Sequence, residues 1–152
     1  MGLGFLAVLL AILLPIVLLG ALQIEDWRRD LTTNWARTDA SSTDPLLRPP
    51  TIRASTAEAA AWLEGFAANR PAWKVVGQTL DAEGGRVRLE RTTRLWRFVD
   101  DVEVTLARVS EGVSLEATSR SRVGKGDLGQ NPRNLRELLA ALRADFPADG
   151  AR

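Results

Sequence analysis

The sequence predicts an α+β protein in which a single N-terminal transmembrane helix precedes a small domain, with a four-stranded antiparallel sheet and two helices on one face of that sheet. Three observations predict this fold class. A run of 23 uncharged residues comes first, an amphipathic pattern of helical period follows, and four strand-like runs then precede a second amphipathic pattern. Strands joined by short turns pair antiparallel, and helices on either side of them in sequence can cover one face.

The uncharged run extends from Gly2 to Ile24. As an α-helix it would be about 34 Å long, enough for a hydrocarbon core of about 30 Å, and transmembrane helices tolerate a proline such as Pro15. A cleaved signal peptide is disfavoured because no Lys or Arg precedes the run and "LLGALQIED" is a poor cleavage site. We therefore expect residues 1–26 to be an uncleaved anchor. The side chains expected at the membrane interface are Trp27, Arg28, Arg29 and Trp35.

Three further segments are expected after the anchor. Residues 27–53 are polar and contain "TDASSTDP" and "RPP", which predicts an extended tether. The α+β domain is expected over residues 54–147, and residues 148–152 form a C-terminal tail. The strand-like runs of the domain cover residues 73–80, 86–93, 99–109 and 113–122.

Both helices of the domain carry start signals. Ser55 and Glu58 have the spacing of a capping box, and Asn69 is expected to end the helix that they begin. Asn131 is expected to cap the last helix, with Pro132 in the first helical position.

The composition excludes several classes of function. Lys and Arg number 20 and Asp and Glu 19, so the formal charge of +1 gives no reason to expect nucleic acid as a partner. The chain has no cysteine, histidine or tyrosine. The commonest general base and metal ligand are therefore absent, as is a thiol nucleophile. We expect no enzyme activity and no cofactor.

An acidic cluster interrupts the third strand-like run. Parity places Asp101 and Glu103 on one face of their strand, and Arg120 and Arg122 on the corresponding face of the next strand. A turn at Ser110-Glu111 sets Asp101 opposite Arg120, whereas a turn one residue later sets Asp101 opposite Arg122 and Glu103 opposite Arg120. Either register predicts structural ion pairs between acids and arginines. The alternatives are a catalytic pair of carboxylates, or a metal site built from Asp100, Asp101, Glu103 and Asp127.

A glycine-rich segment, "RVGKGDLGQNPRN", precedes the last helix. Backbone N–H groups at a helix N-terminus, next to basic side chains, predict a possible anion or partner site. The competing interpretation is a strand-to-helix connection in which Asp127 and Asn131 satisfy the amides of the loop. The residues of the predicted site are Gly124, Lys125, Gly126, Asp127, Gly129, Asn131 and Arg133.

Two segments, "RFVDDVEV" and "SRSRVGKGDLGQNPRNLREL", resemble an uncharacterised family, the domain of unknown function fourteen-ninety-nine. The resemblance covers roughly residues 34–142, and "SSTDPLLRPPTI" is a looser match. The family usually carries a cysteine in its N-terminal stretch, whereas "TNWARTDASS" has none. The resemblance implies no activity and no catalytic residues. It does imply an exported or membrane-attached bacterial protein with relatives in phototrophs.

The leading hypothesis is a non-catalytic, membrane-anchored accessory or assembly subunit that packs on a larger membrane protein complex, for which a photosynthetic complex is one candidate. The alternative is a tethered module that binds a small anion or a lipid headgroup at the glycine-rich loop. A third class, a metal-assisted hydrolase, would use the acids. Expected partners are the lipid bilayer and the complex. The arginines after the anchor favour a cytoplasmic domain, but the family resemblance tips the expected localisation to the periplasmic side of an inner or photosynthetic membrane.

Overall fold

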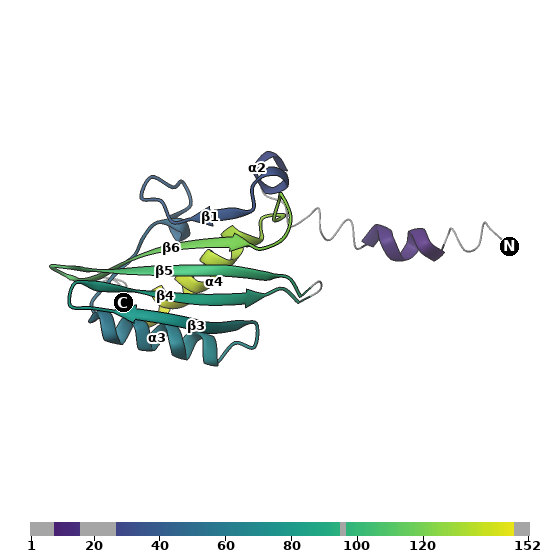
Figure 1. The fold of residues 1–152 in the computed structure, drawn as a ribbon. Helices are drawn as coiled ribbons and strands as arrows, with labels where there is room; N and C mark the ends of the chain where they lie inside the picture. The colour runs from purple at the N-terminus through teal and green to yellow at the C-terminus, as the bar shows by residue number, and fades with distance from the viewer. Residues whose placement is uncertain (1–7, 16–26, 95–96, 148–152) are drawn as a thin grey trace.

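The computed structural model describes residues 8–15, 27–94 and 97–147. It has a six-stranded antiparallel sheet in the order β1-β6-β5-β4-β3, with β2 also paired to β6 (Figure 1). The elements after residue 26 are α2 (Trp27–Thr32), β1 (Trp35–Arg37), η1 (Pro45–Leu47), β2 (Thr51–Ile52), α3 (Thr56–Ala68), β3 (Trp73–Leu80), β4 (Gly84–Thr92), β5 (Val99–Val109), β6 (Gly112–Ser121) and α4 (Gln130–Asp145).

The prediction of four strands is wrong, because two short strands come from the segment expected to be a tether. Trp35 of β1 pairs with Arg120 near the end of β6, and Ile52 of β2 pairs with Val113 near its start. Strands of three and two residues are too short to show the alternation of apolar and polar side chains by which a strand is recognised in sequence. Residues 27–53 therefore form part of the sheet and its surroundings.

The prediction of a transmembrane anchor over residues 1–26 is also wrong. The structure describes residues 8–15 of this segment, and they are helical. Within the described ranges no helix is both long and apolar enough to cross a membrane. The predictions derived from that anchor are corrected with it, namely a single-pass protein of an inner or photosynthetic membrane with a periplasmic domain.

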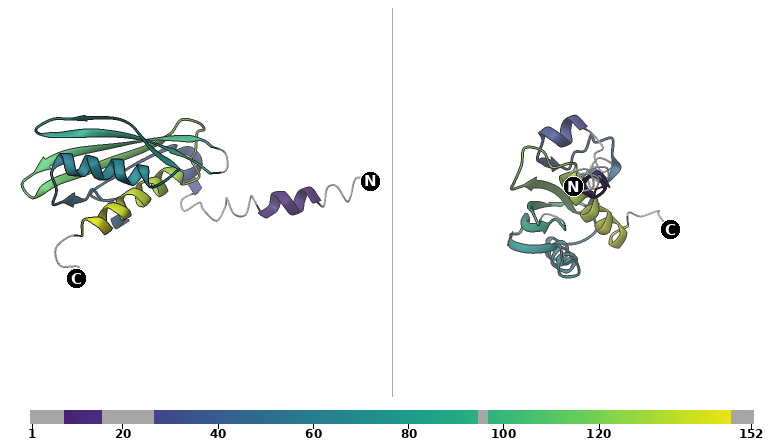
Figure 2. Two further views of the ribbon diagram at one scale, coloured as in Figure 1. Left: turned by 90° about the horizontal axis from the view of Figure 1, so that it is seen from below. Right: turned by 90° about the vertical axis from the view of Figure 1, so that its right-hand side faces the viewer.

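Helices α3 and α4 pack on the same face of the sheet and enclose the core (Figure 2). Ser55 forms the predicted capping box, since its hydroxyl accepts from the amide of Glu58 and the Glu58 carboxylate accepts from the amide of Ser55. The largest fully buried side chains are Leu63, Leu89, Leu106, Leu115, Leu135, Leu138, Leu139, Leu142, Val87, Val102, Val104 and Val113.

The start of α4 differs from the prediction. Its N-cap is Gly129 in the left-handed conformation (φ 75°), without a side-chain cap, and Asn131 lies inside the first turn. Asn131 is fully buried because its side chain binds groups beneath the helix instead of capping it. The helix begins two residues earlier than expected, and Asp127 from the preceding loop accepts from the amides of Gly129 and Asn131.

Candidate functional site

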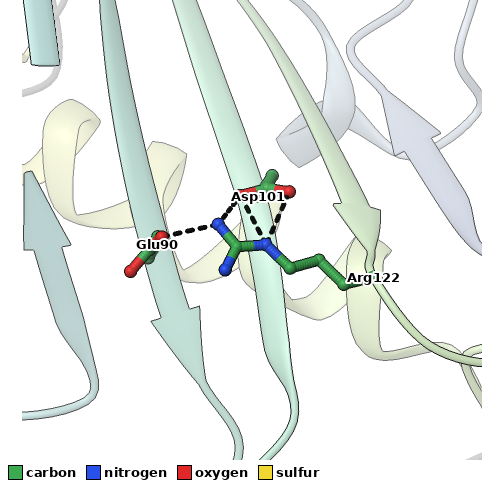
Figure 3. A network of polar contacts seen from close by, with 3 residues as sticks. All are labelled: Glu90, Asp101 and Arg122. Atoms are coloured by element: carbon green, nitrogen blue, oxygen red, sulfur yellow. Dashed lines mark hydrogen bonds and ion pairs between the residues drawn. The ribbon is translucent and has the colours of Figure 1, made fainter. Parts of the chain in front are cut away.

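Arg122 connects three strands on the outer face of the sheet, the face opposite the helices (Figure 3). Its Nε donates to Asp101 Oδ2 at 3.0 Å, and its Nη2 donates to Asp101 Oδ1 at 2.6 Å and to Glu90 Oε1 at 2.5 Å. The hydrogen bonds to Asp101, and then those to Glu90, raise the pKa of Arg122 above its usual value. Both carboxylates are thus engaged with a cation, as in a structural ion-pair network.

The other predicted ion-pair residues have different partners. The turn lies at Ser110-Glu111 and sets Asp101 opposite Arg120, one of the two predicted registers. Asp101 nevertheless binds Arg122, its diagonal neighbour, and Glu103 lies 3.4 Å from the Nε of Arg86 on β4. Arg120 forms no ion pair with any residue that the structure describes. The structure therefore joins Asp101 to Arg122 but separates Glu103 and Arg120 from the predicted pairing.

A buried polar network lies on the inner face, directly beneath the acidic strand. Asp100 is 1% exposed, and its carboxylate accepts from Ser121 Oγ at 2.7 Å and from Asn134 Nδ2 at 2.8 Å. Arg91 is its cross-strand partner on β4. The carboxylate is thus held by neutral donors from β6 and α4, which fixes the helix against the sheet at this end of the domain.

Asn131 extends this network to the N-terminal part of the chain. Its Nδ2 donates to the carbonyl of Asn34 at 2.8 Å and to Ser121 Oγ at 3.0 Å, and its Oδ1 accepts from Ser119 Oγ at 2.6 Å. Asn134 Nδ2 also donates to Ser119 Oγ at 3.1 Å. One set of side chains therefore connects β6, β5, α4 and the residue before β1.

The sequence interpretation missed this network, although a signal was present. Ser119 and Ser121 have the same parity on their strand as the core residues Val113 and Leu115, so alternation places them on the inner face. Asp100 likewise shares its parity with Val102. Buried polar side chains at core positions indicate a specific hydrogen-bonded arrangement, because each needs a partner.

The glycine-rich loop, residues 122–129, is packed against α2. Asp30 of α2 is fully buried, and its carbonyl accepts from the amide of Leu128 at 3.0 Å. A Cβ at Gly126 would lie only 2.5 Å from that carbonyl oxygen, so the close approach requires glycine. Short helix α2 therefore holds the loop against the first turn of α4.

This geometry bears on the predicted anion site. Two of the amides that an anion would need, those of Gly129 and Asn131, already donate to Asp127. Arg133 donates to the carbonyl of Leu128 and to Gln130 Oε1. Lys125 is exposed, and Gly124, which has φ 93°, accepts from Asn34 Nδ2. Asp127 thus satisfies loop amides as the competing interpretation describes, whereas the Asn131 side chain does not, and anion binding stays a prediction.

The acids considered as metal ligands do not lie together. Asp100 is buried under the sheet, Asp101 and Glu103 lie on the opposite face, and Asp127 lies in the loop that caps α4. Across the described ranges, no group of three or more possible ligand side chains is arranged to hold a metal ion.

Two loops and α2 form one end of the sheet, which we call the loop end. The loops are residues 93–94 and 97–98, between β4 and β5, and residues 122–129, and β5 and β6 are neighbours in the sheet (Figure 1). Arg97 and Leu128, the two non-glycine residues with positive φ in the described chain (53° and 52°), lie one in each loop. Left-handed backbone costs such residues about 1 kcal/mol or more, and this strain concentrates at functional sites.

The loop end exposes both apolar and basic side chains. Leu31, Phe98, Val123 and Leu128 are 49%, 45%, 56% and 45% exposed. Besides Arg122, which is paired with Asp101 and Glu90, the exposed basic residues of this end are Arg28, Arg94, Arg97 and Lys125. Sequence reasoning did not find Arg97 and Leu128 because a left-handed backbone at a non-glycine residue leaves no sequence pattern.

The residues expected at a membrane interface are only partly described. Arg28 is exposed on α2, whereas the side chains of Trp27 and Arg29 lie outside what the structure describes. Trp35 is an exposed residue of β1, and the Arg37 guanidinium carbon lies 6.0 Å from its ring centre.

The family described as "Protein of unknown function (DUF1499)" matches residues 28–142. The match covers most of the chain and includes both segments that supply the buried network and the two loops. A comparison with curated proteins finds no match.

Proposed function

Because the chain belongs to the DUF1499 family, whose description assigns no activity, we propose a function from the geometry: this protein is a non-catalytic docking module, an accessory subunit that attaches through its loop end to a larger assembly. The proposal retains the accessory role expected from the sequence, but it does not include the transmembrane anchor that was predicted over residues 1–26.

The observation that supports the proposal is the pair of strained, exposed residues Arg97 and Leu128. A loop that had only to connect two elements would relax from an unfavourable backbone conformation. Here the network around Asp100 and Asn131 and the packing of α2 fix the bases of the loops. Such an arrangement is suited to presenting side chains to a partner with little loss of conformational entropy on binding.

The chemistry of the remaining side chains supports a non-catalytic role. Asp101 and Glu90 are paired with Arg122, and the buried carboxylate of Asp100 is engaged by Ser121 and Asn134. The chain supplies no histidine or cysteine as a general base or nucleophile.

Sedimentation of a detergent-free extract tests this proposal. The full chain, expressed in its native host, is expected to sediment with particles much larger than itself. The double variant Phe98→Ser, Val123→Ser should shift to the position of the free protein, because it removes two exposed apolar contacts without touching the core.

The matched control is Leu80→Ser, Val109→Ser, which removes two exposed apolar side chains, each 39% exposed, at the opposite end of the sheet. It should sediment like the wild type. Equal behaviour of the two double variants, or a wild-type chain found only as free protein, would overturn the proposal.

A further inference from the structure

From its charge and its exposed apolar side chains, we infer that the loop end seats on the surface of an anionic lipid bilayer. This inference rests on the proposed function and names the class of surface that the loop end meets. It concerns a contact made by the folded domain, for which no membrane-spanning helix is required.

The first argument is charge. Arg28, Arg94, Arg97 and Lys125 are exposed, and none forms an ion pair with a residue in the described ranges. Three described acids in or beside these segments have other surroundings. Asp101 binds Arg122, Asp127 caps α4, and Asp30 is buried. The end therefore presents four exposed basic side chains without an ion pair to any acid that the structure describes, and each such group near an anionic membrane surface contributes about a factor of five to binding.

The second argument is the position of the apolar side chains. Leu31 is on α2, Phe98 in the first loop, and Val123 and Leu128 in the second loop, so the apolar side chains come from segments that also carry the basic ones. These segments lie at the ends of the strands and not on the flat face of the sheet (Figure 1). Separate apolar side chains among cations match the boundary between headgroups and acyl chains, where the cations meet phosphates and the apolar groups enter the hydrocarbon.

A protein surface fits this end less well. The core of a protein interface is typically a continuous, closely packed patch with few charged residues, and lysine is depleted there. At the loop end, Lys125 lies two residues after Val123 and Arg97 directly precedes Phe98. On an anionic bilayer, the many mobile headgroups can pair with these basic side chains, so no precisely placed acidic side chain is needed for each.

The test is co-sedimentation of the full chain with vesicles. One set contains about one third phosphatidylserine in phosphatidylcholine and the other phosphatidylcholine alone. The expected result is at least about 30-fold tighter binding to the anionic vesicles, abolished at about 0.5 M NaCl because salt screens the contact. Any affinity contributed by the uncharged residues 2–24 is common to both sets and cancels in the ratio.

The deciding variant is Arg97→Glu, Lys125→Glu, which should lose at least about 30-fold in affinity for the anionic vesicles. Its control is Arg88→Glu, Arg108→Glu, which changes the net charge equally at two exposed sites away from the loop end and should bind like the wild type. Circular dichroism checks that each variant is folded.

Three outcomes would overturn the inference: no preference for anionic vesicles, the same loss in both double variants, or a preference that high salt leaves intact. If no preference is found while Phe98→Ser, Val123→Ser still releases the chain from large particles, a protein surface is the occupant and the proposed function stands. If neither experiment shows dependence on the loop end, both proposals fail.

Discussion

Replacing Asp100 by alanine is expected to lower the free energy of unfolding by about 3 kcal/mol, measured by denaturant unfolding of the full chain. The carboxylate is 1% exposed and accepts from Ser121 and Asn134. Alanine would leave both donors buried without an acceptor and would open a small cavity between β5 and α4. The cost of the unpaired donors accounts for most of the expected effect.

Asp101 supplies the matched control, since it is the same residue type at the next position and points to the opposite face of β5. Its side chain is half exposed, so Asp101→Ala should cost under about 1 kcal/mol. A cost for Asp100→Ala no greater than that for Asp101→Ala would show that the buried network does not hold α4 on the sheet.

Reversing one charge of the outer-face network is expected to have the next largest effect on stability. Asp101→Arg places like charges beside Arg122 and opposite Arg120, and should lower stability by about 1 kcal/mol at low salt. Adding Arg122→Asp should recover much of the loss, because the reversed pair attracts again and neighbouring sites couple. Thermal melts of the two single variants and the double variant measure this coupling.

The same cycle distinguishes a structural role from a chemical one. Arg86→Asp is the control partner, since Arg86 pairs with Glu103 and not with Asp101. It should give no recovery when combined with Asp101→Arg. Equal recovery by Arg122→Asp and Arg86→Asp would mean that overall charge, and not the network of Figure 3, sets the effect.

The elements that could be predicted from the sequence are those with strong periodic patterns or start signals. The runs at 73–80 and 99–109 are β3 and β5, and the capping box at Ser55 begins α3. These features depend on local chemistry, so the residues themselves carry the information. β1 and β2 form by pairing with β6, which is far away in the sequence. Their own few residues therefore show almost no sequence signal of a strand.

Some features of the candidate site could also be predicted from the sequence, and others could not. That Asp101 and Arg122 share the outer face follows from strand parity, but their diagonal contact does not, because the observed register sets Asp101 opposite Arg120. The roles of Asn131 and Asn134 do not, since a helix N-terminal sequence gives equal reason to expect a cap or a buried contact. No local rule predicts the left-handed backbone at Arg97 or at Leu128, whose amide donates to the Asp30 carbonyl of α2.

The claim that the loop end is the surface by which this protein docks is tested most directly by photocrosslinking in intact cells. A photoreactive phenylalanine analogue replaces Phe98 in one strain and Val109, at the opposite end of the sheet, in another; both side chains are exposed to a similar degree. Irradiation should attach a protein or lipid adduct to the chain through position 98 and leave position 109 without one. Adducts at position 109 alone, or at both positions equally, would contradict the assignment of the loop end as the docking surface.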